Sequence, residues 1–271
     1  MGADEPGGER RTLVAGNWKM HHDHLQAIRT VQELGLRLDP GALARVEVTV
    51  HPPFTDLRSV QTVLEDRAIP LVLGAQHCHS DDAGAFTGEV SAPMLARLGV
   101  RYVLVGHSER RQLFGQSDAQ VAAALRAVLR HGMVPVLCVG ETAGEREAGE
   151  TEARLAAQVA AAADGLTVEQ IAGMVVAYEP IWAIGTGATA TADDAQRACA
   201  HIRARLGDLS SPEAAAATRI LYGGSVNPDN TAALVAGPDV GGVLVGGASL
   251  DAASFSDIVS AAATVRRSSR R

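Results

Sequence analysis

The chain has 271 residues, of which 46% are hydrophobic and 20% are charged, and its formal net charge is −7 at pH 7. This composition is that of an ordinary globular protein, and it excludes disordered, collagen-like and coiled-coil chains. The negative charge argues against nucleic acid as a partner, because phosphate contacts need a basic face. At this length, one closed α/β barrel fits as well as two smaller domains.

No apolar run reaches the roughly 18 residues that a membrane-spanning helix needs. Residues 1–11 are polar, whereas a signal peptide would carry an apolar core there. We therefore expect a cytoplasmic protein with no membrane partner. The cysteines Cys78, Cys138 and Cys199 are far apart and form no CxxC pair, so we expect reduced thiols.

Short β-rich runs alternate with longer helical stretches along the chain. Eight runs are continuous and apolar, as in parallel strands buried on both faces: residues 13–16, 46–51, 71–75, 102–106, 134–139, 174–179, 220–223 and 242–245. Apolar residues at helical spacing predict helices between them, such as residues 25–38, 92–98, 118–131, 150–163, 191–206 and 230–236. Eight such units predict one α/β domain, a (β/α)8 barrel over residues 11–264, with a doubly wound sheet as the alternative. The polar tails, residues 1–10 and 265–271, are expected to be flexible.

In such a barrel, catalytic groups follow the carboxyl ends of the strands. The chain places chemically active residues at five of these ends: Asn17 and Lys19, then His107, Ser108 and Glu109, then Glu179, then Ser225, and finally Gly246 and Gly247. A cation, an imidazole, a carboxylate and two glycine-rich turns therefore meet at one rim.

Three of these residues suggest a reaction. Lys19 is the only lysine among 24 basic residues, which indicates a need for a compact ammonium group, unless a surface lysine was retained by chance. Glu179 ends an apolar strand, so it is a candidate base, or else it pairs with an arginine across the barrel mouth. His107 begins a helix, where a neutral imidazole can donate a hydrogen bond to a carbonyl oxygen or serve a structural role.

The two diglycine turns, at residues 223–224 and 246–247, can present backbone N–H groups to a phosphate. Tight turns that need a positive φ are the alternative. Together with the base, imidazole and ammonium groups, a phosphate site describes proton abstraction next to the carbonyl of a phosphorylated substrate. This chemistry requires no cofactor and no metal, and the histidine-rich stretches at residues 21–24 and 77–79 lack an acidic ligand framework.

Six short motifs occur in the order and at the spacing of one known family. They are AGNWKM at residues 15–20, GAFTGE at 84–89, VGHSERR at 105–111, AYEPIWAIGTG at 177–187, YGGSV at 222–226 and LVGGAS at 244–249. On these motifs the chain resembles the triosephosphate isomerase family over about residues 11–264. The resemblance implies a TIM barrel and an aldose-ketose isomerase that interconverts D-glyceraldehyde 3-phosphate and dihydroxyacetone phosphate through a cis-enediolate. Whether such an enzyme serves glycolysis or a side pathway stays open.

The resemblance also implies a role for each matched residue. Glu179 would be the base, His107 the neutral electrophile, and Lys19 the cation that offsets phosphate and enediolate charge. Asn17 and Lys19 would face the substrate oxygens, and Ser108 and Glu109 would orient the site from its edge. Backbone N–H groups would hold the phosphate at Gly185, Ser225, Gly246 and Gly247.

Residues 180–190 resemble the family's lid, which excludes water when it closes. The resemblance implies that Tyr222 and Ser225 latch the closed form. It also implies that Glu141 holds Trp182 in the open form.

The connection over residues 74–90 is longer than an ordinary βα loop and so needs a purpose. In the family this loop enters a neighbouring subunit, and the residue that would reach the partner's active site is Thr87. The resemblance therefore implies a homodimer, with a disordered surface loop as the alternative.

Three residues depart from the family's pattern: His21 and His77 stand where asparagine is usual, and Gln116 where glutamate is usual. They put interface details in doubt and leave two other functions open. The first is a paralogous isomerase that acts on a four-carbon sugar phosphate. The second is a barrel that has lost activity and serves in binding, although the catalytic set is complete.

Overall fold

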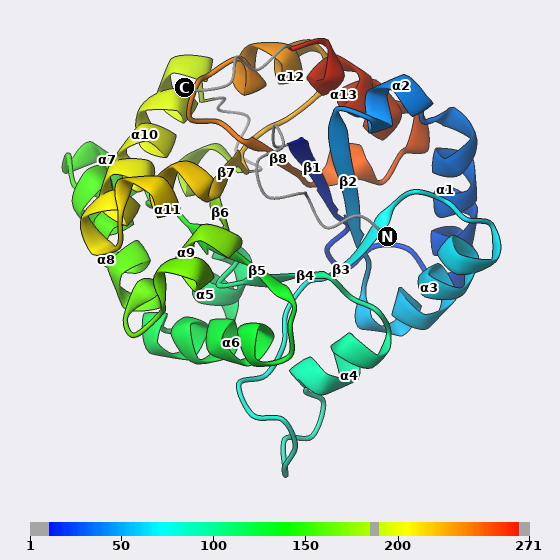
Figure 1. Ribbon diagram of the computed structural model, residues 1–271, viewed down its shortest axis with the longest axis horizontal. Helices are drawn as coiled ribbons and strands as arrows, with labels where there is room; N and C mark the ends of the chain where they lie inside the picture. Colours follow the sequence, from blue (N-terminus) through cyan, green and yellow to red (C-terminus); the bar gives the residue numbers. More distant parts are fainter. Residues whose placement is uncertain (1–10, 185–189, 266–271) are drawn as a thin grey trace.

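The computed structural model describes residues 11–184 and 190–265. Eight parallel strands close into a barrel in sequence order, with β8 paired to β1 (Figure 1). Their bounds are β1 (Thr12–Asn17), β2 (Val46–His51), β3 (Val72–Ala75), β4 (Tyr102–Val105), β5 (Val134–Val139), β6 (Val175–Tyr178), β7 (Arg219–Tyr222) and β8 (Gly242–Val245). The predicted (β/α)8 barrel is confirmed, and the doubly wound alternative is wrong. Of the two tails for which we predicted flexibility, residues 1–10 and 266–271 lie outside the described residues.

The strand ends match the prediction to within one residue. The strand that ends at Val105 is one residue shorter than predicted, because Gly106 has a φ of 72°, a left-handed conformation that breaks the strand. A side chain on Gly106 would also crowd Val121 and the guanidinium of Arg111. The chain therefore turns sharply at Gly106, and this turn presents His107 at the rim.

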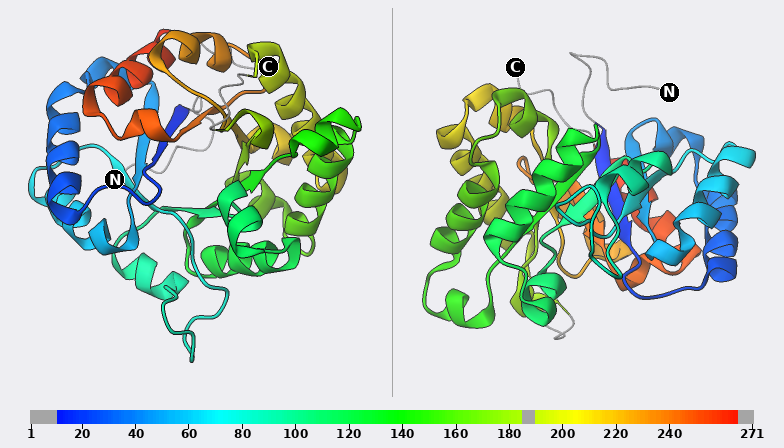
Figure 2. Two further views of the ribbon diagram at one scale, coloured as in Figure 1. Left: turned by 180° about the vertical axis from the view of Figure 1, so that it is seen from behind. Right: turned by 90° about the horizontal axis from the view of Figure 1, so that it is seen from below.

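Helices between the strands form an outer ring around the barrel (Figures 1 and 2). The longer ones are α1 (His24–Arg37), α3 (Leu57–Asp66), α6 (Asp118–Arg130), α8 (Thr151–Ala163), α10 (Ala192–Leu209), α12 (Pro228–Val235) and α13 (Ala252–Thr264). Shorter helices are α2 (Pro40–Leu43), α4 (Ala92–Arg97), α5 (Ser108–Phe114), α7 (Ala143–Glu147), α9 (Val168–Gly173) and α11 (Pro212–Ala217). Three 3-10 turns follow strands at the rim: η1 (Phe54–Asp56), η2 (Ile181–Ala183) and η3 (Gly247–Ser249).

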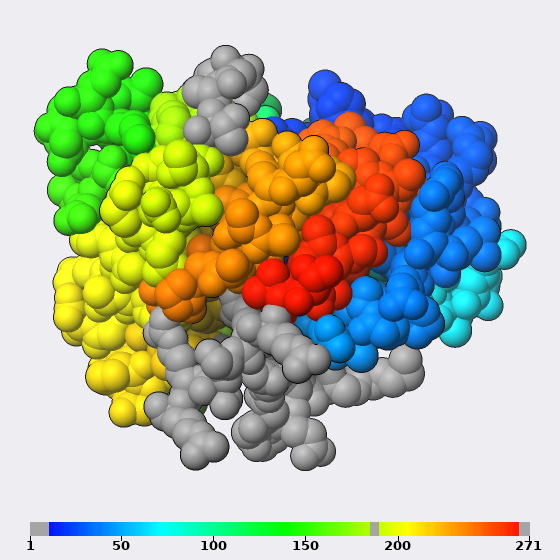
Figure 3. Space-filling model, turned by 90° about the horizontal axis from the view of Figure 1, so that it is seen from above, coloured from blue at the N-terminus to red at the C-terminus, as the bar shows by residue number. Residues whose placement is uncertain are grey.

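All six helices predicted from spacing are present, and capping explains where they differ from the prediction. The helix α12 starts two residues earlier than predicted, because Asn227 caps it and Pro228 fits its first turn. Figure 3 shows α12 and α13 side by side on the outside of the molecule. None of the described helices is long and apolar enough to cross a membrane.

Two apolar layers fill the fold. The inner layer lies inside the barrel and includes Leu13, Tyr102 and Leu244, whereas the outer layer packs the other strand face against the helices. Val14 lies in the outer layer between two inner residues, as the alternation of side chains along a strand requires. Because side chains fill the barrel interior, a ligand can bind only at an end of the barrel.

The amino-terminal end of the barrel is closed by a polar triad of Glu47, Tyr102 and Arg219, which we call the floor triad. Arg219 donates to Glu47 Oε2 and to the Tyr102 hydroxyl over 2.5 Å each, and Tyr102 donates to Glu47 Oε1 over 3.0 Å. The three residues come from β7, β2 and β4, so the triad joins distant strands across the barrel. All three of these contacts are short enough for hydrogen bonds.

The connection between β3 and α4 projects from the body of the molecule (Figures 1 and 2). Residues 81–89 are exposed throughout, including Thr87, and Phe86 is 42% exposed. His79 and Ser91 form a bridge at the base of the loop, so its two arms run together. The loop therefore leaves the barrel and returns to it over a paired base.

Candidate active site

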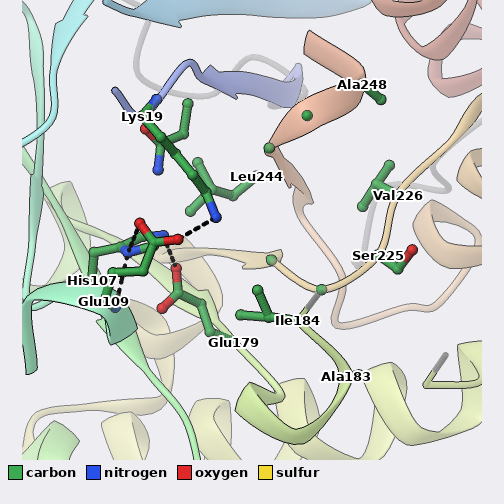
Figure 4. Close-up of a pocket in the computed structure, with 15 residues that line it drawn as sticks. Lys19, His107, Glu109, Glu179, Ala183, Ile184, Ser225, Val226, Leu244 and Ala248 are labelled. Carbon is green, nitrogen blue, oxygen red and sulfur yellow. Dashed lines mark hydrogen bonds and ion pairs between the residues drawn. The ribbon is translucent and has the colours of Figure 1, made fainter. Parts of the chain in front are cut away.

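A cavity of about 410 Å³ opens at the carboxyl end of the barrel, a volume suited to a small molecule. Its lining includes Asn17, Lys19, His107, Glu109, Glu179, Ser225, Gly246 and Gly247, together with apolar side chains of Ile184, Val226 and Leu244. Figure 4 shows Lys19, His107, Glu109 and Glu179 pointing toward one another on one side of the cavity. The structure therefore brings together the residues that the strand ends predicted to meet.

His107 is placed by the turn at Gly106 and caps the first turn of α5. Its Nδ1 atom accepts a hydrogen bond from the backbone N–H of Glu109 over 3.2 Å. A ring nitrogen that accepts a hydrogen bond carries no proton, so the imidazole is neutral and its proton lies on Nε2. This Nε2–H group faces the cavity and can donate to a substrate oxygen.

Glu179 follows β6, and its side chain is only 2% exposed. One carboxylate oxygen, Oε2, accepts a hydrogen bond from the backbone N–H of Ser108 over 2.8 Å. The other, Oε1, lies 3.1 Å from His107 Nε2 but has no aligned hydrogen-bond donor among the described residues. The predicted alternative, an ion pair with an arginine, is absent from the described contacts of Glu179. A buried carboxylate with one free oxygen is well suited to take a proton from a ligand.

A glycine makes the position of Glu179 possible. A Cβ atom on Gly140, at the end of β5, would overlap the carbonyl oxygen of Glu179. The backbone of Glu179 can therefore lie close to the backbone of residue 140 only because Gly140 lacks a side chain.

Lys19 adopts a left-handed backbone conformation, with a φ of 53°, which is uncommon for a residue with a side chain. Its Nζ atom lies 2.6 Å from Glu109 Oε1 at the cavity edge. The backbone is held by the side chain of Gln76, which donates to the carbonyl oxygens of Lys19 (2.7 Å) and His51 (2.8 Å). Strain at this position is thus maintained by specific contacts, which is typical of a functional site.

The diglycine turns do not have positive φ angles. Gly223, Gly224, Gly246 and Gly247 are absent from the described glycines with positive φ, so that alternative is wrong. A Cβ atom on Gly247 would meet no other group within 4 Å, so packing does not require glycine there either. At Gly224 a Cβ atom would overlap the hydroxyl of Tyr222. The turn at residues 246–247 therefore leaves bare backbone facing the cavity, as a phosphate site needs.

A family model described as triosephosphate isomerase matches residues 12–262 of the chain. A curated triosephosphate isomerase from Nocardia farcinica is 50% identical over 254 residues, which cover 94% of this chain and 97% of that protein. One from Corynebacterium diphtheriae is 50% identical over 256 residues, covering 94% and 98%, and one from Mycobacteroides abscessus is 49% identical over 254 residues, covering 94% and 97%. The chain belongs to the triosephosphate isomerase family. It is therefore an enzyme, an isomerase.

Several residues assigned from the triosephosphate isomerase motifs lie beside the cavity instead of lining it. Ser108 acts through its backbone N–H on Glu179, and Tyr222 is buried behind Gly224. Burial raises the pKa of Tyr222 to about 12. Thr87 lies in the projecting loop, away from the cavity of its own chain. Gly185 lies outside the described residues.

The expected contact between Trp182 and Glu141 is present. Trp182 Nε1 donates to Glu141 Oε1 over 2.8 Å, and the hydroxyl of Tyr178 donates to the same oxygen over 3.0 Å. The segment expected to act as a triosephosphate isomerase lid is described at residues 180–184 and at 190, and residues 185–189 lie outside the described part.

Sequence reasoning missed Gln76 as a positioning residue. A side chain that holds two carbonyl groups from other strands leaves no local pattern in the sequence. Among the residues that the structure describes, no group of three or more histidine, cysteine, aspartate or glutamate side chains could hold a metal ion.

The three departures from the family pattern all lie outside the cavity lining. His77 is buried, and its Nε2 atom lies 3.4 Å from Glu89 Oε2. Burial, with the charge of Arg110 and the nearby His79, lowers the pKa of His77 to about 3, so this ring is neutral. The Oε1 atom of Gln116 is buried without a hydrogen-bond partner among the described residues.

Proposed function

We propose that the protein interconverts D-glyceraldehyde 3-phosphate and dihydroxyacetone phosphate, with Glu179 as the base. The free Oε1 atom of Glu179 takes a proton from the carbon next to the carbonyl group, and the electron pair of the broken C–H bond forms the enediolate. Glu179 then returns the proton to the neighbouring carbon. This is the mechanism that the family resemblance implies, and the buried carboxylate with one unpaired oxygen is the observation that carries it.

In this proposal His107 is the electrophile. Its Nε2–H group donates to the carbonyl oxygen and moves a proton between the two enediolate oxygens. The hydrogen bond from the backbone of Glu109 to Nδ1 supports this role, because it fixes the neutral tautomer.

Lys19 and the glycine turns account for the phosphate. The ammonium group of Lys19 is the only cationic group in the cavity lining that the structure describes, and a Cβ on Gly246 would lie 3.5 Å from its Cε atom. We propose that Lys19 and Asn17 contact the substrate oxygens, and that backbone N–H groups at Gly185, Ser225, Gly246 and Gly247 bind the phosphate. Closure of the segment over residues 180–190, latched by Tyr222 and Ser225, would exclude water.

We also propose a cytoplasmic homodimer joined through the loop at residues 74–90. The loop projects from the body, and Met20, Leu113 and Phe114 are exposed apolar side chains that follow β1 and β4 at the carboxyl end of the barrel. Large exposed apolar side chains of this kind favour association. Thr87 would then reach the partner's cavity.

The three-carbon substrate is favoured over a four-carbon one. The relatives named above are all triosephosphate isomerases, and none of His21, His77 and Gln116 lines the cavity. Nothing in the cavity lining favours the four-carbon substrate. The complete catalytic set also speaks against a barrel that has lost activity.

The decisive test is a coupled assay with glyceraldehyde 3-phosphate, beside a Glu179→Gln variant purified in the same way. We expect a kcat/KM of about 10⁷ to 10⁸ M⁻¹s⁻¹ for the wild type, near the diffusional range. The variant should lose about 10² to 10⁴ in kcat while still binding a phosphorylated inhibitor. A rate retained in the variant would refute the role of Glu179, and a wild-type value lower by orders of magnitude would point to the four-carbon substrate.

A further inference from the structure

The strand β2 turns polar residues toward the inside of the barrel. Its three valines belong to the outer layer, so the alternation of side chains along the strand places Glu47, Thr49 and His51 inside. The neighbouring β1 contributes the apolar residues Leu13 and Ala15 to the same inner layer. A polar group in such a layer costs free energy unless it is paired. Glu47 is paired in the floor triad, and the partners of His51 indicate what the last residue of β2 does.

His51 is completely buried, and both of its ring nitrogens have partners. The Nδ1 atom lies 3.1 Å from the carbonyl oxygen of Ala75 at the end of β3, and the Nε2 atom lies 3.0 Å from the hydroxyl of Thr49. A carbonyl oxygen can only accept a hydrogen bond, so Nδ1 carries the proton and donates it to Ala75. Burial lowers the pKa of His51 to about 4, so the ring is neutral and Nε2 accepts from Thr49. This tautomer is the opposite of the one that His107 adopts.

The imidazole of His51 also packs directly on the backbone of β3. A Cβ atom on Gly74 would lie 2.3 Å from both Cε1 and Nδ1 of His51, so the ring occupies the space that a side chain at residue 74 would fill. The residue that lacks a side chain is thus next to the carbonyl group that the ring binds. Together the packing and the hydrogen bond fix the end of β3 against β2.

The fixed end of β3 leads to Lys19. Gln76 directly follows Ala75, and its side chain donates to the carbonyl oxygens of Lys19 and His51. The carbonyl oxygen of His51 also accepts from the backbone N–H of Trp18 over 3.2 Å. The left-handed backbone of Lys19 is strained, so it persists only where surrounding contacts hold it. His51 takes part in these contacts twice, through its ring at Ala75 and through its carbonyl group.

We propose that His51 is a positioning residue for Lys19, because its imidazole orients the peptide before Gln76 and so lets Gln76 hold the strained backbone of Lys19 at the cavity. This role rests on the function proposed above for Lys19. His51 does not line the cavity, so its effect on the reaction is indirect. Loss of the imidazole should therefore cause a weaker form of the defect that loss of the Lys19 ammonium group causes.

The test compares His51→Leu, which keeps an apolar side chain in place of the ring but has no donor, with His51→Asn, whose amide nitrogen can replace Nδ1. The matched control is Thr49→Val, because Thr49 is equally buried and binds the other ring nitrogen, which leaves the bond to Ala75 intact. Per folded molecule, we expect His51→Leu to lower kcat/KM about 3- to 30-fold and Thr49→Val to stay within about twofold of the wild type. Inorganic phosphate should inhibit His51→Leu more weakly, and His51→Asn should recover at least half of the loss on a logarithmic scale.

A double-mutant cycle shows whether His51 acts through Lys19. Independent effects on kcat/KM multiply, whereas His51→Leu should change kcat/KM by less than about twofold when Lys19 is already methionine. Unchanged kcat/KM in His51→Leu, a full multiplicative effect in the double variant, or an equal loss in Thr49→Val would overturn the proposal. A fall in kcat alone, with KM and phosphate inhibition as in the wild type, would also overturn it, because fewer active molecules would explain that result.

The wild-type protein provides a second measurement that needs no variant. The chain contains nine histidines, and ¹⁵N spectra of histidine-labelled protein at pH 7 distinguish the two neutral tautomers. We expect a neutral ring with its proton on Nδ1, whose resonances disappear in His51→Asn. The absence of any such ring from the wild type would overturn the proposal, because the Ala75 carbonyl would then have no donor from His51.

The failure of this proposal can be told apart from failure of the proposed function. Wild-type protein that isomerises the triose phosphate, and loses rate in Lys19→Met, retains the function whatever His51→Leu does. Wild-type protein without this activity would overturn both.

Discussion

At the amino-terminal end of the barrel, the floor triad of Glu47, Tyr102 and Arg219 pairs its polar groups with one another. At the carboxyl end, buried polar atoms of Glu179, Glu141 and Tyr222 have no hydrogen-bond partner within the part of the chain that the structure describes. The same eight strands supply both ends. A buried polar group costs free energy unless it is paired, so the two ends differ in what they contribute to stability.

Single strands therefore carry a residue that stabilises the fold at one end and a residue of the cavity region at the other. β7 begins with Arg219, which closes the floor, and ends with Tyr222, which lies behind the cavity. β4 likewise begins with Tyr102 of the floor and leads to His107 of the site. In a barrel of this kind the floor tolerates full pairing, whereas the rim must keep groups available for a ligand. Substitutions at the two ends should therefore have effects of different kinds.

The largest effect is expected from Arg219→Met at the floor. It leaves Glu47, which is only 4% exposed, as a buried carboxylate without its cation. Breaking such a pair typically destabilises a protein by about 3 to 5 kcal/mol. Chemical denaturation should show this loss, while kcat per folded molecule stays within about twofold of the wild type.

The matched control for the floor is Arg37→Met, which removes an exposed pair with Glu33 on α1. Exposed pairs of this kind contribute about 0.3 to 0.5 kcal/mol. A loss of less than about 1 kcal/mol in Arg219→Met, similar to the control, would show that the floor triad contributes no more than a surface pair.

The next largest effect is expected from Lys19→Met at the rim. This substitution removes the ammonium group that faces the cavity and pairs with Glu109 across 2.6 Å, but it keeps the length of the side chain. We expect kcat/KM to fall about 10²- to 10³-fold, as for loss of one preorganised electrostatic group. Inorganic phosphate should also inhibit the variant more weakly.

The free energy of unfolding should distinguish Lys19→Met from Arg219→Met. The pair of Lys19 with Glu109 is partly exposed, so its loss should change the free energy of unfolding by less than about 1 kcal/mol. A stability loss as large as that of Arg219→Met, with kcat/KM unchanged, would mean that Lys19 is structural.

The barrel itself was predictable because its signals are local. Continuous apolar runs predict the strand ends to within one residue. The residues that follow the strand ends predict that Lys19, His107 and Glu179 lie close together, and all three line the cavity. The floor triad was not predicted, since its members lie 55 to 172 residues apart and pair only once the barrel closes.

The structural reason for the glycine pairs could not be predicted from the sequence. Gly-Gly pairs are often associated with positive φ, which made tight turns an alternative explanation for residues 223–224 and 246–247. The structure shows two other causes: contact with Tyr222 at Gly224, and open space at Gly247. A Gly-Gly dipeptide alone predicts neither a clash with a neighbouring side chain nor a position beside a cavity, because both depend on residues that are distant in the sequence.

The smallest expected effect concerns the pH dependence of stability, where two buried glutamates should act in opposite directions. Burial by itself would raise the pKa of Glu47, but the charge of Arg219 and hydrogen bonds from Arg219 and Tyr102 hold it below its usual value of 4.5. The unfolded chain then binds more protons at this group, so its contribution is present above about pH 4.5 and is lost as the pH falls below that value. At Glu141 burial raises the pKa, so the folded chain binds more protons and the contribution falls as the pH rises past 4.5.

Melting temperatures measured between about pH 3.5 and 6 should reveal this difference in sign. Glu47→Gln should flatten the rise of the melting temperature with pH below pH 4.5, because it removes a group that favours folding at higher pH. Glu141→Gln should steepen the rise above pH 4.5, because it removes a group that opposes it, while its amide oxygen can still accept from Trp182. Parallel curves for both variants and the wild type would show that neither carboxylate changes its proton affinity on folding. Slopes that change in the same direction would contradict the contrast between the fully paired floor and the partly unpaired rim.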